Sequence, residues 1–246
     1  MRKQGLMKFY HFIPSNEGWA DNVPNPKLAR DVMPDWYRKS ELTYEDSDSP
    51  TGESNGLKTC SPFLDTLIAG YMLTTWTNIY VKLGPDGSLD VDWDADASSP
   101  IIMERSPKSG SLMPRPAGHM PNHLVWTPKW GFKSPKGFST LVTHPLNRWD
   151  LPFTTSAGII DSDKFHGSGN IPFFIKEGFE GVIPTGTPIA QLIPIKRESW
   201  TGAVYNPALV DIIPSVGKQM REVVRGYYRD KFWVKKEYRM EQDDKA

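Results

Sequence analysis

The sequence predicts a mainly β protein of short strands with a few peripheral helices. Short apolar runs recur along the chain, and 22 prolines and 20 glycines interrupt them, as is typical of strands joined by turns. The clearest hairpin has residues 79–83 and 88–93 as its strands. Pro85, Asp86 and Gly87 favour the turn, because proline fixes φ and glycine accepts a positive φ.

Composition excludes several classes of protein. The 246 residues hold 29 Lys plus Arg and 29 Asp plus Glu, so the net charge is zero. Without a positive surplus we expect no general attraction to nucleic acid or to a membrane surface. Cys60 is the single cysteine, so no internal disulfide forms. Residues 1–10 lack the apolar segment of a signal peptide, and no run approaches the length of a membrane span.

The remaining elements follow from local patterns. Residues 6–13 predict a strand, and residues 14–56 a long Pro-rich surface excursion with one short helix near 34–39. Residues 62–72 predict a helix that starts at a proline. Residues 105–123 predict a loop. Further strands are expected at 124–127, 137–143, 157–161, 171–175, 180–184 and 188–195.

An amphipathic helix is expected from Gly217 to about Trp233, followed by a charged tail. These elements suggest three segments. Residues 1–56 would pack on the core, residues 57–200 would form the β-rich core, and residues 201–246 would form the helix and tail.

Two ordered motifs resemble the dUTPase family. Residues 157–163 (Ala-Gly-Ile-Ile-Asp-Ser-Asp), followed by Phe165, resemble the strand and turn of dUTPases that end in Gly, two aliphatic residues and Asp. Residues 186–194 (Gly-Thr-Pro-Ile-Ala-Gln-Leu-Ile-Pro) resemble the strand of that family with Ile-Ala-Gln-Leu. The resemblance implies a dUTPase-like β-clip core over residues 124–196. It also places Asp161 where dUTPases hold the attacking water, and Phe165 where a ring stacks on the deoxyribose.

Three departures argue against a transfer of that activity. Phe165 lies one residue late and replaces the usual Tyr. No Arg-Ser-Ser-type phosphate motif lies shortly upstream, and a charged helix and tail replace the Gly-rich arm of the family. Hydrolysis needs its water, its metal-bound phosphates and its closing groups together. We therefore expect Asp161 to cap a turn and assign no catalytic residue; Asp161 is the candidate if catalysis remains.

Three further blocks resemble a family of uncharacterised proteins from tailed phages and bacteria. They are residues 58–65 with Gly70 and Tyr71, residues 143–148 with 150–153, and residues 186–197. This resemblance implies a phage origin and no particular chemistry.

Polar residues between the strands are the candidates for ligand binding. Residues 144–150 gather ionisable groups that predict either a ligand-binding corner beside the Asp161 turn or a hydrogen-bonded turn with an Arg148–Asp150 pair. The candidate ligand-binding residues are Asp161, Asp163, Phe165, His144, Asn147, Arg148 and Gln191.

No metal or cofactor is expected. His119 and His123 have helical ligand spacing, but Pro121 breaks the helix between them, so we interpret them as two loop histidines. Asp90, Asp92, Asp94 and Asp96 alternate without the glycine and glutamate of an EF-hand loop, which favours an acidic strand edge. Cys60 has no paired histidine in a known motif and is not expected to be a nucleophile.

A basic stripe marks the last helix, where Arg221, Arg225 and Arg229 follow i, i+4, i+8 spacing. The stripe is either a solvated helix face, which is the default, or a contact for an acidic partner surface or nucleic acid.

The leading hypothesis is a non-enzymatic phage structural or accessory protein, found in the virion or in the host cytoplasm. It would use the β-clip scaffold for contacts with other phage proteins or with its own copies. A trimer is the favoured homo-oligomer. The alternative is a dUTPase-like protein that binds or hydrolyses nucleotides, or a phage-encoded binder of a small nucleotide signal.

Overall fold

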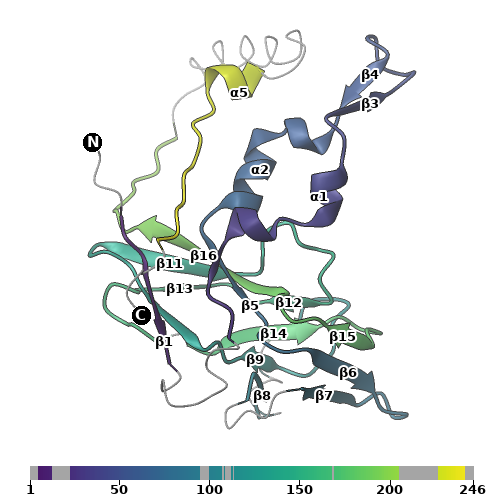
Figure 1. Cartoon of the computed structure of the whole chain (residues 1–246), viewed down its shortest axis with the longest axis vertical. Coiled ribbons are helices and arrows are strands. Elements are labelled where there is room, and N and C mark those ends of the chain that lie inside the picture. The colour runs from purple at the N-terminus through teal and green to yellow at the C-terminus, as the bar shows by residue number, and fades with distance from the viewer. Residues whose placement is uncertain are drawn as a thin grey trace. The chain divides into compact units, whose positions relative to one another are not determined.

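The structure is a computed structural model that describes residues 5–12, 23–94, 100–106, 108, 112, 114–167, 169–204 and 227–241. The chain divides into two compact units (Figure 1). The first comprises Met1–Val32 and Gly70–Arg197, and the second comprises Met33–Ala69 and Glu198–Ala246. These bounds differ from those of the three segments expected from the sequence, since each unit is built from two separate stretches of chain.

Antiparallel sheets make up the first unit. The largest has the order β13 (Gly158–Ile160), β11 (Phe138–Thr143), β16 (Pro188–Lys196), β5 (Tyr71–Thr74) and β2 (Lys27–Leu28). A four-stranded sheet has the order β12 (Phe153–Thr155), β14 (Ile171–Ile175), β9 (Leu124–Trp126) and β8 (Ile102–Glu104). A three-stranded sheet has the order β15 (Gly181–Ile183), β6 (Ile79–Leu83) and β7 (Leu89–Trp93). Finally, β1 (Lys8–His11) pairs with β10 (Trp130–Lys133), and a short 3-10 helix, η2 (Ala29–Val32), follows β2.

Three buried aromatic rings form the centre of this unit. The Trp126 ring stacks on Phe173 with 3.7 Å between centroids, and meets Phe153 edge-on at 5.1 Å. The Trp126 Nε1–H donates to the Thr155 hydroxyl at 3.2 Å, and that hydroxyl donates to the Ile189 carbonyl at 2.7 Å. Since Ile189 belongs to β16, Thr155 links the four-stranded sheet to the five-stranded one.

The second unit contains the short helices and a hairpin. Helix α1 (Asp35–Lys39) is followed by the hairpin β3 (Thr43–Glu45) and β4 (Glu53–Asn55), the 3-10 helix η3 (Leu57–Thr59), helix α2 (Ser61–Ile68) and helix α5 (Tyr227–Lys231). The Tyr37 ring stacks on Phe63 at 6.0 Å. Asp65 accepts hydrogen bonds from Trp233 Nε1 and Lys236 Nζ at 3.0 and 2.6 Å, which fixes residues 233–236 to α2.

The predicted mainly β class is confirmed, as are the 79–93 hairpin and the strands expected from 124 onward. β8, β10 and β12 are not among the strands that the sequence predicts. Two expectations are wrong. Residues 14–56 are not structureless around their short helix, because they include β2 and the β3–β4 hairpin. The helix expected over 62–72 ends at Ile68, and a strand begins at Tyr71.

Of the helix expected from Gly217 to Trp233, α5 is the part that the structure describes; residues 205–226 lie outside the described ranges. Among the helices in those ranges, none has the length and apolar character needed to cross a membrane.

Gly70 explains why the helix does not continue. Its φ of +68° lies in the left-handed region that glycine adopts without strain. A methyl group on its α-carbon would overlap the Leu192 carbonyl oxygen of β16. Only a glycine therefore permits the close approach of the chain to β16 just before β5 begins.

We predict that Gly70→Ala lowers the free energy of unfolding by about 3 kcal/mol or more, since it adds a backbone clash to the strain of a positive φ. Gly87→Ala is the matched control. Gly87 also has a positive φ, but open space surrounds it, so we expect a loss of only about 1 kcal/mol. Urea unfolding followed by tryptophan fluorescence measures both, and equal losses would contradict the clash.

Candidate functional site

Asp161 follows directly after β13 and lies beside the start of β11, because Ile160 pairs with Thr140. Its Oδ1 accepts a hydrogen bond from the Ser139 hydroxyl at 2.7 Å, and the Arg197 guanidinium lies 3.1 Å from the same oxygen. The Ser139 hydrogen bond and the Arg197 charge lower the pKa of Asp161. The carboxylate is thus ionised and already holds two donors on one oxygen.

Asp163 is held more tightly. Arg197 binds it through both terminal nitrogens, with one distance of 2.7 Å, and the Gly137 N–H donates to its Oδ2 at 2.9 Å. The hydrogen bonds from Arg197 hold the pKa of Asp163 well below its usual range, and the hydrogen bond from the Gly137 N–H is the second-largest cause. Arg197 follows β16, so this pair fastens the ends of β11, β13 and β16 together.

Beneath the two carboxylates lies a buried chain of hydroxyl groups. The Ser134 hydroxyl donates to the Phe138 carbonyl at 2.8 Å, so it accepts from Ser162, which lies at 2.8 Å. Ser162 then accepts from Thr140 at 2.7 Å. Ser134 and Ser162 therefore each have a donor and an acceptor role filled and Thr140 has its donor role filled, which offsets the cost of burying these hydroxyls.

The turn after Asp161 is equally local. The Asp161 carbonyl accepts hydrogen bonds from the N–H groups of Lys164 and Phe165, both at 2.9 Å. The Phe165 side chain is 55% exposed, and its ring packs close to the Gly167 backbone. We call the set Ser139, Asp161, Asp163 and Arg197 the aspartate corner. Its contacts are those of a structural clamp, in which Arg197 bridges Asp161 and Asp163.

The residues around His144 form a separate group. Asp161 lies beside Ser139 at one end of β11, whereas His144 follows Thr143 at the other end. Five residues of strand span about 16 Å. His144 and the Asp161 turn therefore lie at opposite ends of β11.

Residues 144–150 form a hydrogen-bonded turn. The Thr155 N–H donates to His144 Nδ1 at 3.2 Å, so His144 carries its proton on Nε2 and donates to the Arg148 carbonyl at 3.1 Å. Burial lowers the pKa of His144 and keeps the ring neutral. Asn147 takes a positive φ of 59° in this turn.

The Arg148–Asp150 pair anchors the turn. Arg148 is buried, and its Nε and Nη2 each lie 2.9 Å from an Asp150 oxygen. Gln191 is fully buried on β16, and its side-chain oxygen accepts from the Leu146 N–H at 2.8 Å. His144, Arg148 and Gln191 thus have protein partners that fix one conformation of the turn.

The two histidines at 119 and 123 lie in loops, as expected, but both are buried. His119 contacts the Ala117 carbonyl and the Thr154 hydroxyl at 3.0 and 2.9 Å. His123 stacks on Phe174 at 5.3 Å, and within the described residues neither of its ring nitrogens has a hydrogen-bond partner. The described ranges contain no group of three or more His, Cys, Asp or Glu that could hold a metal ion.

The other sequence candidates are dispersed. Asp90 and Asp92 are exposed on β7, an edge strand, as expected for an acidic strand edge, and Asp94 accepts from the Asn78 amide at 3.0 Å. Cys60 is an exposed free thiol. Arg229 is exposed, with its guanidinium 5.8 Å from the Trp233 ring. Asp96, Arg221 and Arg225 lie outside the described residues.

Comparison with known proteins leaves the family open. No family model matches the chain, and no curated protein matches it. Among solved structures, the chain is similar to a point mutant of the dUTPase of Staphylococcus bacteriophage 80alpha, at 12% identity and a TM-score of 0.33, over 82% of this chain and 95% of that one. That protein is a dUTPase, the family that residues 157–163 and 186–194 resemble. The likeness carries no role over to a residue of this chain.

We predict that Asp163→Asn flattens the acid limb of the stability profile. A carboxylate with a depressed pKa stabilises the fold above its unfolded pKa of about 3.9, and this contribution is lost as the pH falls further toward the lower folded value. Wild-type stability should fall steeply below about pH 4, and the variant should be less stable at neutral pH with a shallower slope. Urea unfolding midpoints, recorded from neutral pH to below pH 4, measure the stability of both proteins. Asp90→Asn is the control, and a slope unchanged in Asp163→Asn would contradict the clamp.

A second pH effect follows from His123. Burial, with the nearby Arg105 charge, lowers its pKa, so the unfolded chain takes up a proton first as the pH falls through about 6.5. We expect stability to decline between about pH 7 and pH 5, and His123→Phe to reduce this decline. Part of the decline should remain in His123→Phe, because burial also lowers the pKa of His144. His166→Phe, at an exposed histidine, should keep the wild-type profile, and thermal melts across the range test both.

Proposed function

We propose that this chain is a non-enzymatic phage structural or accessory protein that acts through protein–protein contacts on a β scaffold. The observation that carries the proposal is the double pairing of Arg197 with Asp161 and Asp163. A carboxylate that orients water needs a free basic oxygen, and a cation that binds phosphate needs free donors. In the aspartate corner Arg197 and the Asp163 carboxylate are engaged with each other, and Asp161 holds Ser139 and Arg197 on its Oδ1, which disfavours the nucleotide-hydrolysing alternative.

The strand that leads into this corner offers a contact surface. β13 lies at the edge of the five-stranded sheet, and its Ile159 is 65% exposed. Ile159 is in register with Leu141, which pairs in turn with Ile193, so a row of aliphatic side chains crosses this face of the sheet. Phe165 lies just beyond the strand and is also exposed. An apolar edge strand of this kind is suited to contact with another protein.

A second copy of the chain is the partner that we propose for this surface, with a trimer as the assembly. The zero net charge supports self-association, because copies of the chain repel each other weakly. Other proteins of the same phage particle are the partners that the accessory role requires.

We predict that Ile159→Lys reduces the wild-type oligomer to monomer, since a charge on the edge strand must be desolvated at an interface. Light scattering coupled to size exclusion measures the mass. Tyr44→Lys is the matched control, because Tyr44 is an exposed apolar residue on β3. A wild-type chain that is monomeric, and that mass spectrometry does not find in purified phage particles, would overturn the proposed function.

A further inference from the structure

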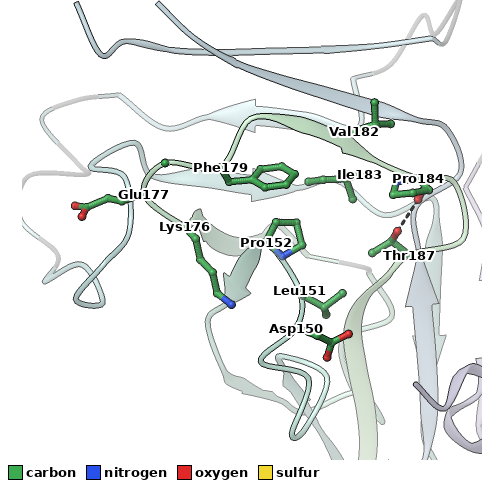
Figure 2. Close-up of a pocket in the computed structure, with 11 residues that line it drawn as sticks. Asp150, Leu151, Pro152, Lys176, Glu177, Phe179, Val182, Ile183, Pro184 and Thr187 are labelled. Atoms are coloured by element: carbon green, nitrogen blue, oxygen red, sulfur yellow. Dashed lines mark hydrogen bonds between the residues drawn. The ribbon is translucent and has the colours of Figure 1, made fainter. Parts of the chain in front are cut away.

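A pocket of about 460 Å³ lies in the first unit and shares no residue with the aspartate corner (Figure 2). Three segments enclose it: residues 150–152 after the His144 turn, residues 176–179 after β14, and residues 182–184 of β15 and its turn, joined by Thr187. The volume falls within the range of roughly 300–1,000 Å³ that is usual for small-molecule sites. Of the residues 144–150 that the sequence offers as a ligand-binding corner, Asp150 lines it, whereas His144, Asn147, Arg148, Gln191 and the residues of the Asp161 turn do not.

The interior of the pocket is apolar. Leu151 and Ile183 are buried, and Pro152 and Phe179 complete the wall. In Figure 2 the Phe179 ring points along the pocket toward Ile183, and Pro152 lies on the facing segment. A ring side chain and a proline present flat apolar surfaces, which suit a planar ligand group better than a branched one.

Asp150, Lys176 and Glu177 are the charged residues that line the pocket, and the two carboxylates are each paired with an arginine. At one end Arg148 pairs with Asp150, and at the other Arg115 lies 3.7 Å from Glu177. Lys176, by contrast, has no ion pair with a carboxylate among the described residues, and its Nζ donates to the Trp149 carbonyl at 2.5 Å. The neighbouring Glu180 does not line the pocket, and its carboxylate accepts from the Leu83 N–H of β6.

The position of this ammonium group is fixed by its surroundings. The Lys176 N–H donates to the Pro152 carbonyl at 2.9 Å, which joins the two walls of the pocket, and the Arg148–Asp150 pair holds the turn that supplies the Trp149 carbonyl. One hydrogen bond leaves two of the three ammonium protons for a ligand. A cation held in this way requires little ordering when an anion binds.

We propose that this pocket binds a small molecule that combines a flat apolar ring with one anionic group, a carboxylate or a phosphate. The ring lies against Phe179 and Pro152, and the anion accepts hydrogen bonds from Lys176. This inference goes beyond the proposed function and does not depend on it, since the pocket shares no residue with the β13 edge.

The test uses three probes with the same ring: indole-3-acetate, the neutral indole-3-acetamide and the cationic tryptamine. Titrations of the whole, isotope-labelled chain are followed by NMR. We expect the acetate to bind most tightly and tryptamine most weakly, with shifts at Lys176, Phe179 and Val182. An indole phosphate ester, as a fourth probe, distinguishes the two kinds of anion.

Two variants locate the site. Lys176→Met should weaken acetate binding by about two- to fivefold, the effect of one exposed ion pair, and leave the amide unchanged. Val182→Glu, at a half-exposed position of the wall, should weaken the acetate and leave tryptamine unweakened. Lys82→Met, at an exposed lysine of β6, is the control and should bind as wild type. The proposal is overturned if the acetate does not bind, if it binds no better than tryptamine, or if neither pocket variant weakens it.

Discussion

The buried hydroxyl of Thr155 is the contact on which the two main sheets depend. It accepts from the Trp126 indole and donates to the Ile189 carbonyl, while the Thr155 N–H donates to His144. One residue of β12 therefore positions the aromatic centre, the longest strand and the His144 turn. A side chain of the same shape without the hydroxyl would leave an indole N–H and a carbonyl buried and unpaired, each at a cost of about 1–3 kcal/mol. The hydrogen bond from Thr155 to His144 also helps to position one wall of the pocket, because Asp150, Leu151 and Pro152 lie between these two residues in the chain.

At the other end of β11, ion pairs rather than a hydroxyl group hold the strands together. Arg197, Asp161 and Asp163 would each be reactive or ligand-binding groups if they stood alone. Together the one guanidinium and the two carboxylates hold the ends of three strands, with one negative charge left over. The consequence for function is that a sequence motif with the order of a nucleotide-hydrolysing site has, in this chain, the contacts of a structural clamp.

Much of the fold could be predicted where the signal is local. The Pro85-Asp86-Gly87 turn fixed its hairpin, and Pro and Gly marked the bounds of most strands. The predicted helix over 62–72 is too long because Tyr71 and Met72 continue its apolar pattern, although Gly70 signals its end. β8 and β12 span three residues each and are not predicted, although β9, β13 and β15 are equally short and are predicted. The β3–β4 hairpin was missed because its Asp- and Ser-rich turn was interpreted as part of a loop.

The site was predictable only in part, for the same reason. The Arg148–Asp150 pair was anticipated as one alternative, since its members are two residues apart. The pairing of Asp163 with Arg197 spans 34 residues and has no local signal. The pocket was not anticipated, because its walls come from three segments that meet only in the fold.

The edges of the sheets differ in a way that bears on how an assembly could grow. β7 carries Asp90 and Asp92 at its edge, so two copies that met there would bring like charges together, whereas β13 presents isoleucine. In an assembly built through β13, β7 would be an edge at which the addition of a further copy is repelled. Strand addition would then stop once the apolar edges were satisfied, which favours a small closed particle over a continuing fibre.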